Sequence, residues 1–431
     1  MPARAGGKSG VASHETAPGA TAASQAAKPA LRAMFSSLAH RDFRLVLLGT
    51  FGVQFGQWTQ QIGRGLLAWQ LTKSEFQLGL VTMAMGLAMF LAAPIGGVLS
   101  DRFDRRKVIM VSQTCLMANS LATALLVALN AITLSELYVL SFTNGALFAF
   151  NGPSRQAIIF EIVGKRDLPN AIAINSVTMN AMRVIGPAVG GIMVATVGIE
   201  GTFYIQSGGY VVSLLSVVAM RHVRAQETKE TGSFLRNMAD GLSYIRRTDV
   251  VRSLLIVSII GSLLGTSFVP LMPAYVDHTL HLSDSAFGYL MASLGGGAML
   301  GSVFVAATGG SGGKGMLLIG VVVSTGALLM VLGGLPVVGV AAVALLGLGF
   351  CNAVTLALCN TLLQINLQDV YRGRVMSIYF LTFGLSSFGS LALGSVAEAM
   401  GLRVSFVGLG IMVLALIGFV NLRSSKVRRL G

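Results

Sequence analysis

The sequence predicts an all-α, polytopic membrane protein, and three observations lead to that fold class. Charged residues make up only 11% of the 431 residues and hydrophobic residues 54%, whereas soluble domains carry roughly 25% charged residues. Apolar stretches of about 20 residues, long enough to cross a bilayer, recur along the chain. The basic residues gather between alternate stretches. So little charge cannot cover a soluble surface, which excludes most soluble enzymes, disordered chains and disulfide-stapled secreted domains.

Residues 1–40 precede the first apolar stretch. They are rich in Ala, Gly and Ser and contain no apolar run of helical length. This composition predicts a disordered cytoplasmic tail and lacks the apolar region of a signal peptide. A basic, acid-poor composition is also typical of a transit peptide, which is the alternative interpretation.

Twelve apolar stretches follow, and each is expected to be a helix because a backbone in hydrocarbon must satisfy its own hydrogen bonds. The predicted spans are residues 43–70, 77–100, 108–130, 134–156, 171–197, 202–221, 251–276, 285–307, 315–334, 337–364, 375–399 and 402–422. An even number of spans places both termini on the same side of the membrane.

The basic residues predict the orientation of the spans. Of the 31 Lys and Arg residues, all but Arg64, Lys73, Arg183 and Arg403 are assigned to segments on the side of the N-terminus. In membrane proteins the cytoplasmic segments carry the excess of Lys and Arg. Both termini are therefore expected on the cytoplasmic side of a bacterial inner or plasma membrane. The net charge of +14 could suggest a nucleic-acid partner. The distribution of the basic residues instead predicts that the protein lies in a lipid bilayer and has no nucleic-acid partner.

The longest segment between spans, residues 222–250, divides the chain into six-helix bundles at 41–221 and 251–422, with a cytoplasmic tail at 423–431. Apolar residues in this linker recur at helical spacing, which predicts an amphipathic helix on the inner membrane surface or a solvated linker helix. These apolar residues are Phe234, Leu235, Met238, Leu242 and Ile245.

Internal repetition supports two pseudo-symmetric halves. A shift of 204 residues places Gly97 on Gly301 and Gly190 on Gly394. Duplicated halves with a binding site at the middle of the membrane between them are typical of transporters.

The loop after the second span carries a motif. It reads Gly97-Val98-Leu99-Ser100-Asp101-Arg102-Phe103-Asp104-Arg105-Arg106-Lys107. This loop resembles the G-x-L-x-D-R-x-G-R-R/K signature of the major facilitator superfamily, with Asp104 at the usual glycine, where it is expected to change the turn. The resemblance implies that Asp101 is a latch against the N-terminus of span 11 near Arg374, stabilising the outward-open state. It also implies that Arg102, Arg105 and Arg106 form ion pairs around it and contact anionic lipid.

The fifth span carries a second motif, which includes Gly186, Pro187, Gly190 and Gly191. It resembles the G-P-x-x-G-G core found in exporters of the same superfamily, and the alternative is ordinary glycine-mediated helix packing. Further stretches resemble the branch of bacterial enterobactin and macrolide exporters. These include Pro153-Ser154-Arg155-Gln156-Ala157, Asp167-Leu168-Pro169-Asn170-Ala171 and Arg372-Gly373-Arg374-Val375-Met376-Ser377. A span-4 arginine found in many proton-driven relatives is replaced by Ser141, which puts the usual proton-coupling arrangement in doubt.

Polar side chains within the spans are the candidate substrate contacts, because ionisable and polar groups in a bilayer face a cavity. Two basic residues, Arg64 and Arg183, lie within spans away from their cytoplasmic ends, and no acid lies deep in a span. This pattern favours an anionic or zwitterionic amphiphile as substrate. The nearest candidate for proton coupling is Asp277, at the outer rim. The candidates are Gln54, Gln57, Trp58, Gln61, Arg64, Asn144, Asn151, Ser176, Asn180, Arg183, Asn352 and Thr355.

The expected function is secondary active, proton-linked efflux of a siderophore, antibiotic or carboxylate metabolite by alternating access, carried out by a monomer. Two alternatives stay open: proton symport of an organic anion into the cell, and a sensor or scaffold that keeps the fold without transport. No nucleophile–base pair, metal cluster or phosphate loop is found in the sequence, so neither an enzyme nor a cofactor is expected. The three cysteines have no paired spacing and are expected to be small buried or lipid-facing side chains.

Overall fold

The computed structural model describes residues 36–221, 234–308 and 313–423 and omits some side chains within those ranges. The predicted tails and residues 222–233 of the linker therefore lie outside the described residues, except for the ends nearest the spans. The described part is helical and contains no strand, as the sequence predicts. The elements of the first half are η1 (Ser36–Ala39), α2 (Arg41–Thr72), α3 (Glu75–Arg102), α4 (Arg105–Ala128) and α5 (Leu134–Val218).

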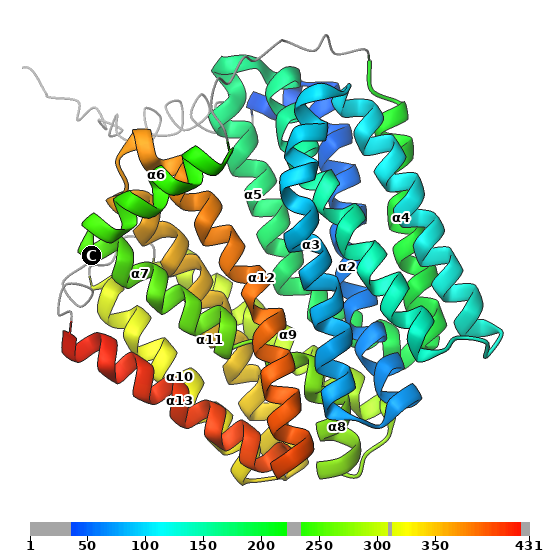
Figure 1. Ribbon diagram of the computed structural model, residues 1–431, viewed down its shortest axis with the longest axis vertical. Coiled ribbons are helices and arrows are strands. Elements are labelled where there is room, and N and C mark those ends of the chain that lie inside the picture. Colours follow the sequence, from blue (N-terminus) through cyan, green and yellow to red (C-terminus); the bar gives the residue numbers. More distant parts are fainter. Residues whose placement is uncertain (1–35, 222–233, 309–312, 424–431) are drawn as a thin grey trace, which may run out of the picture.

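The second half begins with the linker helix α6. Its elements are α6 (Phe234–Arg247), α7 (Asp249–Ile259), η2 (Ile260–Leu264), η3 (Val269–Leu271), α8 (Met272–Ala274), η4 (Tyr275–Thr279), α9 (Asp284–Thr308), α10 (Lys314–Gly334), α11 (Val338–Asn366), α12 (Asp369–Met400) and α13 (Leu402–Arg423). Figure 1 shows the two halves side by side, with α2–α5 in one bundle and α7–α13 in the other.

Helix α5 covers three of the predicted spans. Its backbone leaves the helical region at Gly164 and at Gly198, where φ is 66° and 74°. Both are left-handed conformations that a residue with a side chain rarely adopts, so glycine permits the chain to reverse there. Residues 134–163, 165–197 and 199–218 are thus three parts of α5, which correspond to predicted spans 4, 5 and 6.

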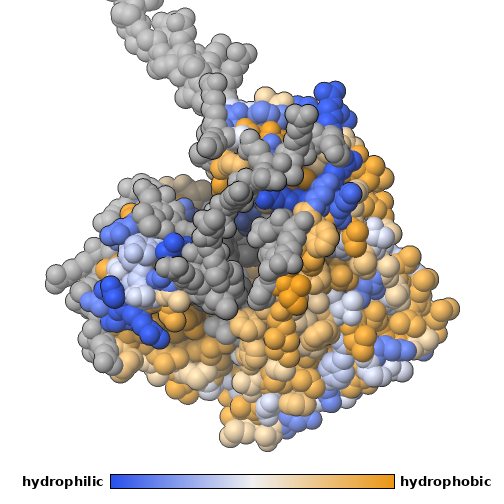
Figure 2. Space-filling model, turned by 45° about the horizontal axis from the view of Figure 1, so that its top comes forward, coloured by the Kyte–Doolittle hydropathy of each residue, from blue (hydrophilic) through white to orange (hydrophobic). Residues whose placement is uncertain are grey.

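Eleven of the twelve predicted spans lie on α-helix, and the spans differ in polarity. Within the described residues, seven helices are long and apolar enough to cross a membrane by themselves. Large apolar side chains such as Val111, Leu215 and Val343 are more than 60% exposed, as side chains that face lipid would be. Figure 2 shows hydrophilic residues gathered at the end that carries α6, with hydrophobic residues over the flanks. The chain is therefore a multi-pass membrane protein.

Span 7 is not the uninterrupted helix that the sequence predicts. It divides into α7, two π-helical turns η2 and η4, and the short η3 and α8. Pro270 and Pro273 lack the backbone N–H that an α-helix needs. The break is buried, since Ser267 and Leu271 are both 0% exposed. Irregular backbone at membrane depth is tolerated where protein covers it.

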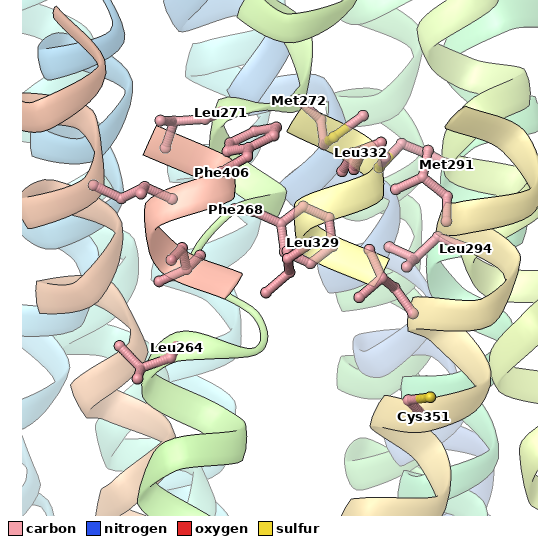
Figure 3. Close-up of a cluster of buried hydrophobic side chains, with 14 of the residues drawn as sticks. Leu264, Phe268, Leu271, Met272, Met291, Leu294, Leu329, Leu332, Cys351 and Phe406 are labelled. Atoms are coloured by element: carbon pink, nitrogen blue, oxygen red, sulfur yellow. The ribbon is translucent and has the colours of Figure 1, made fainter. Parts of the chain in front are cut away.

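The core of the second half surrounds this break. In Figure 3, Phe268 and Leu271 belong to one buried cluster with Phe406 of α13 and with Leu329 and Leu332 of α10. The Phe268 and Phe406 rings meet edge to face with their centroids 6.2 Å apart. Aromatic and aliphatic packing thus replaces the regular helix as the source of order in span 7.

The linker helix α6 packs on α12. The Tyr244 ring stacks on the Tyr371 ring with centroids 4.3 Å apart, and Arg374 forms an ion pair of 3.1 Å with Asp240. Ile245 is buried, while Leu242 is 43% exposed. One edge of α6 is therefore attached to the second half. Packing on α12 differs from both sequence-based alternatives, which were a helix on the inner membrane surface and a solvated linker helix.

The halves meet at one end of the molecule. We call it the distal end, defined by residues 69–76, 277–284 and 398–403, and we call the opposite end, which carries α6 and the α3–α4 loop, the linker end. Figure 1 shows the halves in contact at the distal end and diverging toward the linker end.

Close backbone approach joins the halves at two places. A Cβ atom on Gly191 of α5 would overlap the carbonyl oxygen of Gly288 on α9, and one on Gly79 of α3 would lie 2.7 Å from the Cα of Leu391 on α12. The α5–α9 and α3–α12 contacts are matching pairs under the internal repeat. Glycines at both contacts allow the two halves to pack backbone to backbone.

Candidate functional site

Arg64 on α2 is the buried cation of the candidate site. The residue is 7% exposed, and its guanidinium donates a hydrogen bond of 2.8 Å to the thioether sulfur of Met85 on α3. A thioether is a weak acceptor. Among the residues that the structure describes, no carboxylate forms an ion pair with Arg64. A buried guanidinium without an acid nearby favours an anionic ligand group.

The glutamine stripe on α2 is divided in the structure. Gln54 and Trp58 are half-buried and Gln61 is exposed. Gln57 accepts hydrogen bonds from Gln206 Nε2 at 3.1 Å and from the Tyr210 hydroxyl at 3.3 Å. Gln57 therefore contacts the interior of the first half.

The buried polar group that Gln57 joins was not among the residues predicted from the sequence. Gln206 also donates to Gln60 Oε1 at 3.3 Å and to the Tyr210 hydroxyl at 3.2 Å, and Ser120 donates to Gln206 Oε1 at 2.8 Å. We call Gln57, Gln60, Ser120, Gln206 and Tyr210 the glutamine cluster. Gln206 and Tyr210 stand four residues apart in span 6, so their helical spacing was the signal that could have found them.

Asn144 lies beside this cluster. It is fully buried, the Tyr210 hydroxyl is close to it, and within the described residues its amide atoms Nδ2 and Oδ1 make no hydrogen bond of good geometry. The hydroxyl of Ser141, one turn earlier on α5, is buried and unpaired in the same described part. Buried amides need a partner, and water or a ligand can supply one.

Asn151 does not stand with these residues. Its Nδ2 donates to Ser112 Oγ at 3.1 Å, and its Oδ1 accepts from Arg155 Nε at 3.0 Å. Arg155 also donates to Thr50 Oγ1 at 3.2 Å and to Ser213 Oγ at 2.6 Å. Its guanidinium joins α2 to the first and third parts of α5. The prediction that Arg64 and Arg183 are the only basic side chains within the bundles is therefore wrong.

We expect Arg155→Lys to destabilise the first half without changing ligand selectivity. Lysine presents one ammonium group and cannot keep the diverging bonds that the planar guanidinium makes. Losing two buried hydrogen bonds to a charged group costs about 3 to 6 kcal/mol in unfolding free energy. Thermal unfolding in detergent measures the loss. A melting temperature equal to that of the wild type would contradict the structural role.

The exporter motif on the second part of α5 forms helix contacts. A Cβ atom on Gly186 would overlap the Trp58 side chain, and one on Gly190 would lie 3.1 Å from Ile62. Gly191 meets Gly288 of the other half, as described above. Ser176 is exposed. The side chains of Asn180, Arg183 and Pro187 lie outside the described residues.

The candidates on span 10 lie in the second half. Asn352 is half-buried and Thr355 is 7% exposed. A Cβ atom on Gly261 of η2 would lie 3.0 Å from Thr355 Cγ2, so α11 packs against the interrupted span there. No hydrogen bond joins these two residues to the first-half candidates within the described part of the chain.

The loop motif lies at the linker end. The side chains of Asp101 and Arg102 lie outside the described residues, as do the surroundings of Gly97. Asp104 is the N-cap of α4 and accepts a hydrogen bond of 2.9 Å from the backbone N–H of Arg106, which explains an aspartate at this turn. Arg105 forms an ion pair of 2.5 Å with Glu161 of α5. Arg106 donates to the Val218 carbonyl at 2.8 Å, so both arginines contact their own half.

Asp277 lies in the distal contact. Its carboxylate accepts hydrogen bonds from Lys73 Nζ at 2.5 Å and from the Trp69 indole at 2.8 Å, both from the first half. These two donors hold the pKa of the Asp277 carboxyl below its ordinary value, with Lys73 the larger cause. The neighbouring His278 contacts Glu75 Oε1 at 3.1 Å. Glu398 of α12 accepts from Ser74 and from the backbone of Phe76.

The chain is similar to transport proteins across almost its whole length. Residues 32–429 match the family described as transmembrane secretion effector. The chain is 24% identical to a staphyloferrin A transporter of Staphylococcus aureus over 85% of this chain and 92% of that protein. It is 27% identical to the multidrug efflux pump Tap of Mycolicibacterium fortuitum, over 84% of this chain and 91% of the pump. It is 25% identical to the enterobactin exporter EntS of Shigella flexneri, over 92% of this chain and 93% of the exporter.

The fold is similar to that of solved transporters. A bacterial homologue of the human lysosomal transporter Spinster, in an inward-facing and unoccupied conformation, superposes with a TM-score of 0.70 at 14% identity, over 90% of this chain and 98% of that one. The nucleoside transporter NupG superposes with a TM-score of 0.67 at 13% identity, over 88% of this chain and 98% of the NupG chain. The family match, the exporter relatives and the two-bundle fold agree. The chain therefore belongs to the transmembrane secretion effector family of major facilitator superfamily transporters, and it is not an enzyme.

Proposed function

We propose that the chain exports a small anionic or zwitterionic amphiphile by proton-linked alternating access. The observation that carries this proposal is Arg64, a buried cation whose hydrogen-bond partner is the Met85 thioether. An anionic ligand group would complete its coordination. Exporter relatives named for enterobactin and for several drugs support an efflux direction and an amphiphilic cargo.

The ligand would contact both charged and neutral groups. Its anionic group would bind Arg64, and the buried amide of Asn144 and exposed Gln61 would offer further hydrogen bonds. Gln54 and Trp58 on α2, Ser176, Asn180 and Arg183 on α5, and Asn352 and Thr355 on α11 are the remaining proposed contacts. Polar anchors among apolar walls are typical of sites for small amphiphiles.

The halves are in contact at the distal end and apart at the linker end, an arrangement that fits the state in which an exporter takes up its substrate. The basic residues of the chain favour a cytoplasmic linker end in a bacterial inner membrane, with both termini inside. The distal contacts would then close the outer face, and ligand would enter from the cytoplasm. Closure of the linker end by the latch residues Gly97, Asp101, Arg102, Arg105 and Arg106 would follow in the outward-open state.

Proton coupling is proposed for Asp277. Lys73 and Trp69 lie on the other half, so they separate from Asp277 when the distal end opens. The pKa of Asp277 would rise toward its ordinary value in that state and fall again on closure. A proton taken up from the outer side would thus be released to the cytoplasmic side, through the open linker end, when the distal end closes.

The pH dependence has a definite sign. Because closure lowers the pKa of Asp277, the contact is stabilised above the ordinary carboxyl pKa and is lost as pH falls through the lowered value. We expect closure of the wild type to weaken in acid and closure of Asp277→Asn to weaken less, because Glu75 and Glu398 also contact across the halves. Distances between spin labels on the α2–α3 and η4–α9 turns measure this. Equal acid responses in both proteins would contradict the coupling role.

Ligand binding tests the proposed substrate class. Purified full-length protein is screened by thermal shift against siderophores, antibiotics and aromatic acids, each with a cationic analogue of similar size. The proposal expects stabilisation by anionic or zwitterionic members and none by the cationic analogues. A preference for cations would overturn it.

A further inference from the structure

A cavity of about 730 Å³ opens at the distal end, between the end of α10, the start of α13 and the contact of the two halves. Glu75 and His278 line one side, and Arg403 lies at the start of α13 on the other. This cavity is separate from Arg64 and the glutamine cluster, which contribute no residue to its lining. Its size is that of a small-molecule site.

The mouth of the cavity carries opposite charges. Glu75 is only 9% exposed, and one carboxylate oxygen contacts His278 at 3.1 Å. Arg403 donates to the carbonyl oxygens of Gly333 at 3.3 Å and Gly334 at 3.1 Å, which fixes its guanidinium at the rim. A guanidinium has five N–H donors, so these two bonds leave donors for a ligand. The rim therefore offers an acid and a cation together.

The lining becomes apolar away from the mouth. Val404, Val407 and Ile411 stand three or four residues apart on α13, so they share one face of the helix. Val404 and Ile411 are 50% and 52% exposed. From Val404 to Ile411 the helix rises about 10 Å, because each residue adds about 1.5 Å. Since α13 is an apolar span, this face descends into the hydrocarbon from the membrane boundary.

We propose that this cavity binds a zwitterionic phospholipid whose headgroup carries a primary ammonium. The lipid phosphate binds Arg403, the ammonium binds Glu75, and an acyl chain lies along Val404, Val407 and Ile411. The ligand carries one anionic and one cationic group, which match the cation and the acid at the mouth. The charged headgroup of such a lipid lies at the membrane boundary, where the acid and the cation are, and its acyl chain lies below, along the apolar face of α13.

The bound lipid joins the two halves. Glu75 begins α3 in the first half, whereas Arg403 belongs to α13 in the second. A headgroup that contacts both residues binds the distal-closed state more tightly than an open one, and so shifts the population toward closure. Lipid binding at this site therefore also regulates the opening of the distal end. This regulation does not depend on which substrate is transported.

A filled cavity provides the first test. A Cβ atom on Gly408, which lines the cavity, would meet no atom within 4 Å, so the side chain of Gly408→Phe can begin there and occupy the cavity. Gly418→Phe is the matched control, because Gly418 lies on the same helix, has equally open surroundings and does not line the cavity. Native mass spectrometry of the full chain from nanodiscs counts retained phosphatidylethanolamine. We expect retention to be lost in Gly408→Phe and kept in Gly418→Phe; equal retention in the two would overturn the site.

The headgroup assignment has its own test. Phosphatidylcholine has no N–H to donate to a carboxylate, so we expect about tenfold weaker retention than for phosphatidylethanolamine, as the loss of a charge-assisted hydrogen bond implies. Glu75→Gln should abolish that difference. Equal retention of both lipids by the wild type would overturn the assignment. Arg64→Gln should retain lipid like the wild type, which separates failure of this site from failure of the cargo proposal.

Discussion

Arg64→Gln is expected to weaken binding of an anionic ligand by about 10- to 100-fold, because a hydrogen bond to a charged group contributes roughly 1.5 to 3 kcal/mol. Glutamine keeps a polar side chain at the site but removes the charge. With Met85 as its hydrogen-bond partner, the guanidinium loses little within the protein when it is replaced. The effect is therefore expected on binding and hardly on folding. Titration of the best ligand from the thermal-shift screen measures the affinity.

Two controls make this result specific. Arg64→Lys keeps the charge and should retain most of the affinity. Asn151→Ala removes a polar residue that bonds to Ser112 and Arg155 within the first half, and it should leave the ligand affinity unchanged while lowering the melting temperature. An Arg64→Gln protein that binds with wild-type affinity would remove Arg64 from the site.

Gly288→Leu is expected to abolish transport by preventing closure of the distal end. A side chain at Gly288 would overlap the carbonyl oxygen of Gly191 on the other half. Neither backbone can move without separating α5 from α9. Overpacking of this kind costs about 1 to 3 kcal/mol, enough to reverse an equilibrium between two states of similar energy. The halves should then be held apart at the distal end.

Gly296→Leu is the matched control, because Gly296 lies on the same helix α9 and a Cβ atom there would meet nothing within 4 Å. Spin-label distances across the distal end should lengthen in Gly288→Leu and remain short in Gly296→Leu. Unchanged distances in Gly288→Leu, in a folded protein, would show that the glycine contact does not control closure.

The sequence predicted the helices well because hydrocarbon imposes a simple rule on the backbone. Apolar stretches of fixed length favour helix, so eleven of the twelve predicted spans lie on α-helix and the seventh is interrupted. Span 7 differs because its interruption depends on tertiary cover. Proline marks where a helix can break, and the packing of Phe268 against Phe406 maintains the break, which no local pattern encodes.

The candidate site was predicted less completely, for a geometric reason. A polar stripe identifies the face of a helix but not the neighbour that it meets. Gln57 bonds to Gln206 and Tyr210 in span 6, and Asn151 bonds to Arg155 rather than lining the ligand site with Arg64. Arg64 alone could be identified directly, because an isolated charge within an apolar span needs an explanation of its own.

Transport measured in a defined direction tests the central claim most directly. Inside-out membrane vesicles with an acidic lumen are supplied with the anionic ligand from the screen, and its accumulation is followed for the wild type and for Arg64→Gln. The proposal predicts accumulation by the wild type that collapses when the proton gradient is removed, together with accumulation near background for Arg64→Gln. Absence of accumulation by a folded, ligand-binding wild-type protein would contradict proton-linked export.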